Sequence, residues 1–281
     1  MNKNSSDRSR GRVDYWQGKV VLVTGGSAGL GEAICRRLVQ ERASVVAVAR
    51  NADRLQEAIE RWQATPEQAC AFAADVTQDA DVERLAAWVT ERYGGLDAVV
   101  HAAGLSDRGR LVETPLEKFR QLWELNALAA VRVAQHFWPL LCRSHGHLVL
   151  IGSLASKCAA RYLGAYPASK FALAAIAQQL RLEGEDSGVH TLLVCPGPIA
   201  RPDAGRRYDQ AVRDLPPEAR KPGGGVRLKG IDPDRLARQI LESCRKRQAE
   251  LVVPARARWL FALLQLSPAW GDWLAKRFTS G

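Results

Sequence analysis

The segment YPASK places Tyr166 and Lys170 four residues apart, a spacing that can support acid–base chemistry. A free tyrosine has a pKa of about 10 and is a poor base at neutral pH. A nearby ammonium group favours the phenolate and makes tyrosine a usable general acid or base. Pro167 suits the first turn of a helix, and a helix that begins there puts both side chains on one face. The spacing also arises by chance on many helices, so the pair alone does not identify a site.

A glycine-rich segment, TGGSAGLG at 24–31, follows the β-branched run KVVLVT and opens an amphipathic stretch. Glycine allows positive φ and a close approach of the backbone to a phosphate. The N-terminus of a helix adds free N–H groups and the positive end of a dipole. We therefore expect a pyrophosphate of a dinucleotide cofactor to be bound by Gly25, Ser27, Ala28, Gly29, Leu30 and Gly31.

The end of the second apolar run, at 44–50, indicates which cofactor is bound. An acidic residue there would bind the ribose 2′-OH of NAD, whereas an arginine suits the 2′-phosphate of NADP. The chain has Arg50 followed by Asn51, and no acid. We therefore expect NADP(H), with Arg50 pairing the phosphate. Asp75 and Val76, after the third apolar run, are expected beside the adenine.

Further motifs occur along the chain in a characteristic order: HAAG at 101–104, Asn126, Ser153 and PGP at 196–198. Together with the glycine-rich segment and YPASK, this set resembles the short-chain dehydrogenase/reductase family over residues 18–200. The resemblance implies an enzyme that reduces a ketone or aldehyde with NADPH, or oxidises the alcohol. A non-catalytic NADPH sensor or scaffold is the alternative, although all four catalytic positions are filled.

The resemblance implies a role for each matching residue. Tyr166 would give a proton to the carbonyl oxygen, and Ser153 would hydrogen-bond that oxygen. Lys170 would hold the nicotinamide ribose and lower the pKa of Tyr166, while Asn126 would hold a water that relays protons. Further cofactor contacts are implied at Ala102, Gly104, Pro196, Gly197 and Ile199. Relatives are usually dimers or tetramers built on segments that match 115–142 and 168–187, so we expect a homodimer or homotetramer.

Two positions depart from the family pattern. The family usually has Asn where this chain has His101 and Ala102, and we expect His101 to be a structural imidazole. Four residues beyond Gly197 the family often has Thr in contact with the nicotinamide amide, whereas this chain has Arg201. Because of the second departure, the motifs do not show which residue contacts the nicotinamide amide.

These residues need a scaffold, and the alternation of short apolar runs with helical patterns predicts it. Continuously apolar strands separated by helices indicate a parallel sheet covered on both faces. We expect a single doubly wound Rossmann domain of the α/β class with a mostly parallel seven-stranded sheet. The strands are expected near 19–24, 44–50, 71–76, 96–104, 146–153, 189–197 and 250–255, and long helices over 115–142, 168–187 and 232–248.

Three segments are expected, the second of which carries an insertion. Residues 1–16 form a disordered basic tail and 17–255 the dehydrogenase domain. Within that domain, residues 200–231 interrupt the alternation and lie where an insertion would cover the ligand crevice, so they are either a substrate lid or a loop without a role. Residues 256–281 form a C-terminal amphipathic helical extension.

The C-terminal extension combines Trp259, Trp270 and Trp273 with neighbouring Arg and Lys residues. That composition suits the plane of a membrane interface. A helical pair that covers the substrate pocket or a subunit interface fits equally well. With the lid, this segment suggests a bulky, lipid-like substrate and peripheral membrane contact through 256–278.

Charge and composition limit the remaining function classes. The net charge is +10, with a net of +8 on residues 201–281 and −1 on residues 13–200. No nucleic-acid-binding motif is present, so we expect no nucleic-acid partner. The six cysteines are scattered and the histidines lack neighbouring ligands, so we assign no metal. Without an apolar leader, the expected location is cytoplasmic, with the inner membrane face as the alternative.

Overall fold

A parallel sheet forms the centre of the computed structural model, which describes residues 15–201, 206–221, 223 and 228–279. Its strands are β1 (Val20–Thr24), β2 (Ser44–Ala49), β3 (Ala69–Ala73), β4 (Ala98–His101), β5 (His147–Ile151), β6 (His190–Pro196) and β7 (Glu250–Val253). The helices are α2 (Gly29–Gln40), α3 (Ala52–Trp62), α4 (Asp79–Tyr93), α5 (Leu116–Trp123), α6 (Ala129–Ser144), α7 (Tyr166–Glu183), α9 (Pro233–Arg245), α10 (Ala257–Leu266) and α11 (Pro268–Thr279).

The strand order is β3-β2-β1-β4-β5-β6-β7, and every pairing within this sheet is parallel. The prediction of a doubly wound α/β fold is confirmed, and the sheet is wholly rather than mostly parallel. The order reverses between β1 and β4. In such sheets ligands bind at the carboxyl ends of the strands beside this reversal.

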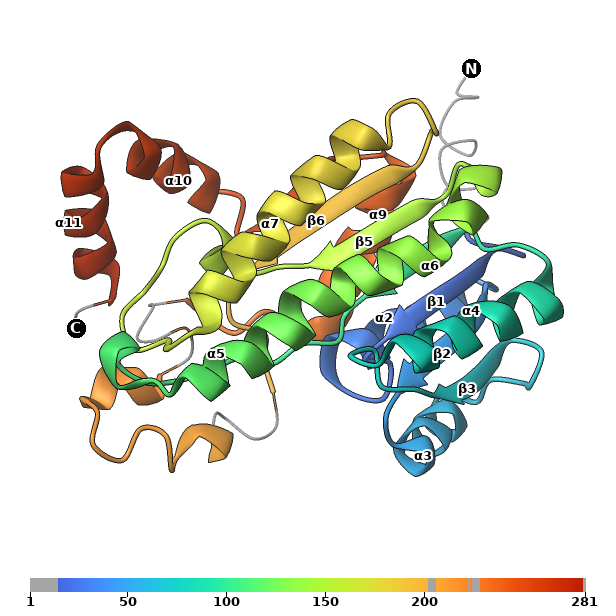
Figure 1. Ribbon diagram of the computed structural model, residues 1–281, viewed down its shortest axis with the longest axis horizontal. Coiled ribbons are helices and arrows are strands. Elements are labelled where there is room, and N and C mark those ends of the chain that lie inside the picture. The colour runs from blue at the N-terminus through green and yellow to red at the C-terminus, as the bar shows by residue number, and fades with distance from the viewer. Residues whose placement is uncertain (1–14, 202–205, 222, 224–227, 280–281) are drawn as a thin grey trace, which may run out of the picture.

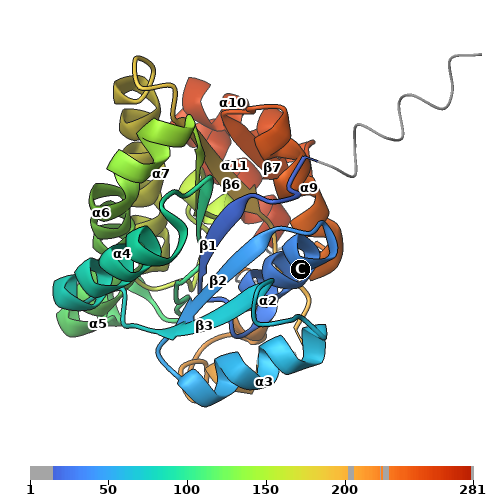
Figure 2. The ribbon, with the colours of Figure 1, turned by 90° about the vertical axis from the view of Figure 1, so that its right-hand side faces the viewer.

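The apolar strands divide their side chains between two cores, which explains why the runs are continuously hydrophobic. Val21 and Val23 of β1 join one core, packed with α2 and α9. Leu22 joins the other, packed with α4, α6 and α7. Figures 1 and 2 show these two helical layers on opposite faces of the sheet.

The prediction of one continuous helix over 115–142 is wrong in one respect. The segment is divided into α5, a π turn at Glu124–Leu128, and α6. A π turn inserts an extra residue into the helical ladder and often lies at a functional site. Here it redirects Asn126, which is buried and bonded to the loop after β4. Apolar periodicity continues through the turn, so it could not be predicted from the pattern.

The predicted tail boundary also needs correction, because residues 15 and 16 belong to the folded domain. Trp16 is buried in the first core, and Tyr15 bonds His147 at 2.7 Å. His147 Nδ1 lies 2.8 Å from Nδ1 of His190, whose Nε2 lies 2.8 Å from the carbonyl oxygen of Gln248. That carbonyl can only accept, so Nε2 of His190 donates to it, and Nδ1 of the neutral His190 ring accepts from Nδ1 of His147. The Nε2 atom of His147 is then an acceptor, so the Tyr15 hydroxyl donates to it. The chain of bonds ties the N-terminal segment to β5 and β6. The rest of the predicted tail, residues 1–14, lies outside the described residues.

Beyond β6 lies the segment 200–231, which the sequence predicts to be either a substrate lid or a loop without a role and which is called the lid for short. Its described parts include short 3-10 turns at Arg206–Tyr208 and Pro217–Arg220, and Ile199 pairs with Ile231 where the region leaves and rejoins the domain. Residues 202–205, 222 and 224–227 of the predicted lid lie outside the described residues. Figure 1 shows the lid and the pair α10–α11 at the same end of the molecule.

Candidate active site

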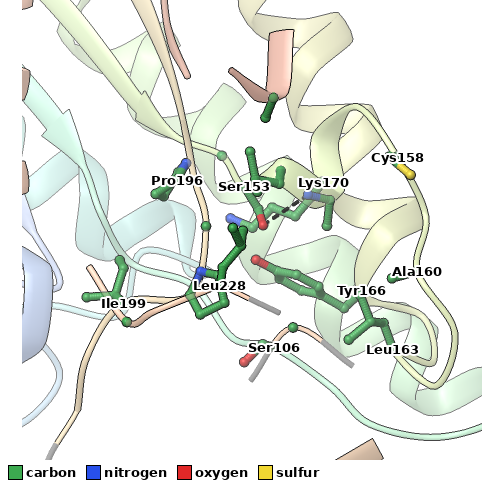
Figure 3. A pocket seen from close by; sticks show the side chains of 18 of the residues that line it. Ser106, Ser153, Cys158, Ala160, Leu163, Tyr166, Lys170, Pro196, Ile199 and Leu228 are labelled. Atoms are coloured by element: carbon green, nitrogen blue, oxygen red, sulfur yellow. Dashed lines mark hydrogen bonds between the residues drawn. The ribbon is translucent and has the colours of Figure 1, made fainter. Parts of the chain in front are cut away.

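Tyr166 lies at the start of α7, with Pro167 in the first turn as the sequence predicts. Its hydroxyl points toward the hydroxyl of Ser153 (Figure 3). Ser153 follows β5 and caps a short 3-10 turn, where its Oγ also accepts from the backbone N–H of Ala155 at 3.1 Å. This backbone bond fixes the rotamer of Ser153, so the two hydroxyls are aimed at one point in the cavity.

Lys170 lies one turn beyond Tyr166 on the same face of α7. It is 5% exposed, and its Nζ donates to the carbonyl oxygen of Ile151 at 2.8 Å. The Nζ atom is 5.9 Å from the centre of the Tyr166 ring. The amino group is therefore held beside the tyrosine by the last residue of β5.

Burial shifts both pKa values at this pair. Desolvation lowers the pKa of Lys170 to about 8, because a buried ammonium loses its hydration. Desolvation also raises the pKa of Tyr166, whereas the Ser153 hydrogen bond and the charges of Arg108 and Arg201 lower it. Two arginines, Arg108 and Arg201, therefore favour the phenolate form of Tyr166.

Asn126 lies in the π turn and is 1% exposed. Its amide accepts from the N–H of Leu105 at 2.9 Å and donates to the carbonyl of the same residue at 2.8 Å. The amide also donates to Ser169 Oγ at 2.9 Å. These three bonds occupy the side chain, so Asn126 fixes the loop after β4 against α7.

The glycine-rich segment has the shape that a diphosphate requires. Gly25 and Gly29 have φ of 71° and 60°, which favour glycine. A Cβ on Gly31 would overlap the carbonyl oxygen of Gly25. Ala28 precedes α2 without a side-chain cap, so the first N–H groups of the helix find no acceptor on its side chain. A dinucleotide phosphate fits this exposed helix end.

The predicted adenosine residues lie at the ends of β2 and β3. Arg50 is exposed, and Asn51 caps α3 by accepting from the N–H of Arg54 at 2.9 Å. Asp75 Oδ1 accepts from the backbone and hydroxyl of Thr77. Val76 is buried beside it. Arg50 is therefore the exposed positive charge at the place where a 2′-phosphate is expected.

A cavity of about 830 Å³ opens beside Tyr166, within the usual size range of small-molecule sites. Several predicted site residues line it together, namely Ala102, Gly104, Ser153, Tyr166, Lys170, Pro196, Gly197 and Ile199. Asn126 stands behind this wall. The glycine-rich segment and the predicted adenosine residues lie outside the cavity, along β1 to β3.

Some lining residues were not predicted from the sequence. Ser106 and Arg108 come from the loop after β4, and Tyr208 comes from the lid. The hydroxyl of Tyr208 bonds the hydroxyl of Ser106, and Arg108 stacks on the Tyr208 ring at 4.2 Å. Leu260 and Phe261 of α10 complete the apolar wall. The segment 105–110 has no periodic pattern, so only the fold shows that it meets the lid.

His101 is buried at the end of β4, where its Nδ1 lies 3.1 Å from the hydroxyl of Thr24. Desolvation, with the charge of Lys170, lowers its pKa to about 3. A neutral imidazole in this place connects β4 to β1, which fits the expected structural role. Among the described residues, no group of three His, Cys, Asp or Glu side chains could hold a metal ion.

Comparison with known protein families identifies the family of this chain. A family model described as short chain dehydrogenase matches residues 19–211. The chain belongs to the short-chain dehydrogenase/reductase family. It is 36% identical to the 1-deoxy-11-beta-hydroxypentalenate dehydrogenase of Streptomyces exfoliatus, covering 67% of this chain and 70% of that protein. It is 28% identical to the ketoacyl reductase HetN of Nostoc, covering 93% of this chain and 89% of that protein.

Solved structures share the fold of this chain. The L-sorbose reductase of Gluconobacter frateurii, solved with NADPH and L-sorbose, has a TM-score of 0.72 and 26% identity over 84% of this chain and 95% of its own. A variant of actinorhodin polyketide ketoreductase, solved with NADPH, has a TM-score of 0.74 and 26% identity over the same shares. As a member of this family, the chain is an NAD(P)-dependent oxidoreductase that acts on a small molecule.

Proposed function

We propose that this protein is an NADP(H)-dependent oxidoreductase that reduces a ketone or aldehyde, or oxidises the corresponding alcohol. The observation that carries the proposal is the convergence of the Tyr166 and Ser153 hydroxyls on one side of an apolar cavity, with Lys170 buried behind them. Two hydroxyls aimed at one point can hold a single carbonyl oxygen.

The chain's own residues supply proton transfer and orientation. NADPH, when bound, supplies the hydride. Ser153 hydrogen-bonds the carbonyl oxygen and Tyr166 donates a proton to it as negative charge develops there. Lys170 would hold the ribose hydroxyls and resupply the proton. Since both N–H groups of the Asn126 amide already donate to protein groups and its oxygen accepts from Leu105, we propose that the backbone of the π turn, rather than this side chain, holds a relay water.

A Tyr166→Phe variant tests the mechanism. Removal of the hydroxyl takes away the proton donor but leaves the ring in place, so we expect turnover to fall at least about 100-fold. NADPH binding, followed by the change in nicotinamide fluorescence, should be retained. Undiminished turnover would remove Tyr166 from the mechanism. If the wild-type protein binds NADPH tightly but reduces no carbonyl compound in a broad panel, the sensor or scaffold function replaces this proposal.

The preference for NADP(H) is supported by Arg50 and by the absence of an acidic residue at the end of β2. In an Arg50→Gln variant we expect the Kd of NADPH to rise about tenfold or more, because a charge-assisted bond to the 2′-phosphate is lost. The Kd of NADH should hardly change, and it serves as the control within the same variant. Equal weakening of both cofactors would contradict this role for Arg50.

The C-terminal extension supports a bulky, lipid-like substrate and a membrane-surface location. The inner side of α10 supplies Ala257, Leu260 and Phe261 to the cavity. Its outer side presents Trp259 and Leu266, which are 78% and 80% exposed. A helix that is apolar on opposite faces needs a second apolar neighbour. No helix of the described chain is long and apolar enough to span a bilayer. From the exposed apolar side of α10 we propose contact with the membrane surface, favoured by the nearby Arg256 and Arg258.

The expected homodimer or homotetramer remains a prediction. The resemblance implies subunit contacts through the segments 115–142 and 168–187. Exposed apolar side chains in these segments include Trp123, Leu128 and Phe171. Such groups suit a subunit interface. Light scattering of the purified protein would give the number of subunits.

A further inference from the structure

The cavity beside Tyr166 has walls of different chemistry on two sides. Figure 1 shows the pair α10–α11 on one side of the carboxyl end of the sheet and the lid on the other. Both α10 and the lid supply lining residues, together with Tyr166 and Ser153. A substrate that is held by its carbonyl oxygen at these two hydroxyls therefore has a different neighbour on each side.

The α10 side of the cavity is apolar. Ala257, Leu260 and Phe261 line it at spacings of three and four residues, which place them on one face of the helix. Phe261 also packs against the core on the α4, α6 and α7 side of the sheet. Arg256 precedes this face and is exposed, so its charged end can stay in water.

Two contacts hold α10 in this position. The guanidinium group of Arg258 donates to the carbonyl oxygen of Glu250 at 2.7 Å, which ties the start of α10 to β7. A Cβ on Gly271 of α11 would lie 2.7 Å from Cδ2 of Leu264, so α11 packs closely on α10. The apolar face is therefore part of a packed pair of helices.

The side formed by the lid and the loop after β4 is polar. Ser106 and Tyr208 both line the cavity there, and their hydroxyls bond each other. The guanidinium carbon of Arg108 lies 4.2 Å from the centre of the Tyr208 ring. A hydroxyl has one donor and two acceptor sites, so a hydroxyl in one hydrogen bond can still make another. This side of the cavity can thus hydrogen-bond an oxygen of the substrate.

The polar side is close to the reaction centre. Burial raises the pKa of Tyr166, and the charge of Tyr208 raises it further. A substituent next to the reacting carbonyl is therefore within reach of the Ser106–Tyr208 pair.

Two unlike walls determine how an unsymmetrical ketone lies in the cavity. Once its oxygen is held by Ser153 and Tyr166, the two substituents of the planar carbonyl point to different sides. Hydride reaches the carbonyl carbon from the side of the cofactor, so an exchange of the two substituents gives the opposite configuration of the alcohol. A polar substituent loses its hydration against the apolar face of α10, whereas it gains a hydrogen bond at Ser106. One orientation is therefore favoured.

We infer that the cavity sorts the two substituents of an unsymmetrical ketone, with the apolar one against Leu260 and Phe261 and an oxygen-bearing one at Ser106. The substrate class is thus a ketone with an apolar chain or ring on one side of the carbonyl and a hydroxyl- or carbonyl-bearing group on the other. The alcohol then forms in one configuration. The inference rests on the proposed function, because it concerns how the substrate of that reaction lies in the same site.

The test uses two matched series of ketones. Alkyl hydroxymethyl ketones have a hydroxyl beside the carbonyl, and alkyl ethyl ketones have a methyl group in place of that hydroxyl. Each is reduced with NADPH by the wild type, Ser106→Ala, Leu260→Asn and Leu263→Asn, and kcat/KM and the ratio of the two enantiomers of the alcohol are measured. Leu263→Asn is the matched control, because Leu263 lies on the same helix, is 46% exposed and is not among the residues that line the cavity.

We expect the wild type to form one enantiomer from the hydroxymethyl ketones in at least about tenfold excess, and a smaller excess from the ethyl ketones. Ser106→Ala should lower kcat/KM for the hydroxymethyl series about tenfold and leave the ethyl series nearly unchanged. Leu260→Asn should lower the enantiomer ratio of the hydroxymethyl series about 3- to 10-fold, because its amide accepts the polar substituent on the α10 side. Leu263→Asn should keep the wild-type ratio, and melting temperatures would show that the variants fold.

Three results overturn the inference: nearly equal amounts of both enantiomers from the wild type, the same enantiomer ratio in Leu260→Asn and Leu263→Asn, or equal slowing of both series by Ser106→Ala. In each of these cases the reduction itself leaves the proposed function standing. Failure of the wild type to reduce any ketone would instead contradict the proposed function.

Discussion

At the scale of single residues, the site is made by side chains whose other contacts fix them. Ser153 is oriented by the N–H of Ala155, and Lys170 by the carbonyl of Ile151. These partners are backbone groups at the end of β5, so the geometry of the site depends on where this strand stops. The residue types alone give the chemistry, and the backbone contacts give the direction in which each side chain points.

The buried His101 predicts how stability depends on pH. Its pKa is about 3 when folded and about 6.5 when unfolded, so the unfolded chain takes up the proton first as the pH falls. Stability should therefore be lost between pH 6.5 and 3, by up to about 1.4 kcal/mol per pH unit from this residue. In a His101→Asn variant, whose amide can still bond Thr24, this share of the loss should disappear.

Urea unfolding at pH 7.5, 5.5 and 4.5 would measure that difference. The buried His147 and His190, whose pKa values are also lowered, should leave a residual acid dependence in the variant. Identical pH dependence of the wild type and the variant would mean that the pKa of His101 is the same in the folded and unfolded protein, so that the residue takes up its proton without loss of stability.

At the scale of elements, two local breaks in regular structure shape the site. The π turn within the predicted helix over 115–142 directs Asn126 to the loop after β4. The turn between β1 and α2 brings Gly31 against the backbone of Gly25. Residues of the lid segment and of α10, which are distant in the sequence, then line the cavity. Each of these features is a contact between elements rather than a property of one element.

The tight turn before α2 gives a prediction at this scale. In a Gly31→Ala variant the new methyl group would overlap the carbonyl of Gly25, so α2 must shift away from the phosphate site. We expect the Kd of NADPH to rise at least about tenfold and stability to fall by about 1–3 kcal/mol. Gly95→Ala is the control, because a Cβ there meets nothing within 4 Å. Fluorescence titration and thermal unfolding would show both effects, and equal behaviour of the two variants would count against the tight packing.

At the scale of the whole molecule, the C-terminal pair α10–α11 presents several strongly exposed large apolar side chains at the active-site end. Trp259, Leu266, Trp270 and Trp273 are each more than half exposed. The cavity and this surface share α10, so a substrate that partitions into a bilayer would have a short route to Tyr166. The charge distribution also favours contact with an anionic membrane surface, since residues 201–281 carry a net charge of +8.

Membrane association can be measured by sedimentation with vesicles. We expect the protein to bind vesicles of phosphatidylglycerol more than vesicles of phosphatidylcholine, and less at high salt. A Trp259→Glu, Leu266→Glu variant should bind about tenfold less, because two apolar contacts are lost. Val112→Glu is the control, since Val112 is 91% exposed and lies outside both the C-terminal pair and the helices expected at the subunit interface. If the control loses as much binding, or if the double variant instead changes the number of subunits, the exposed face of α10 serves another purpose.

The sequence by itself determined the layered sheet, since continuously apolar strands between amphipathic helices must be buried on both faces. It also determined the family and the order of its motifs, including Tyr166, Lys170 and the glycine-rich segment. Only the tertiary structure decided that Trp16 joins the core, that Asn126 lies in a π turn, and that Arg108 meets the lid beside Tyr166. Periodicity and local motifs report on the neighbours of a residue along the chain. Pocket walls are made by loops far apart in sequence, whose meeting depends on packing that no local pattern records.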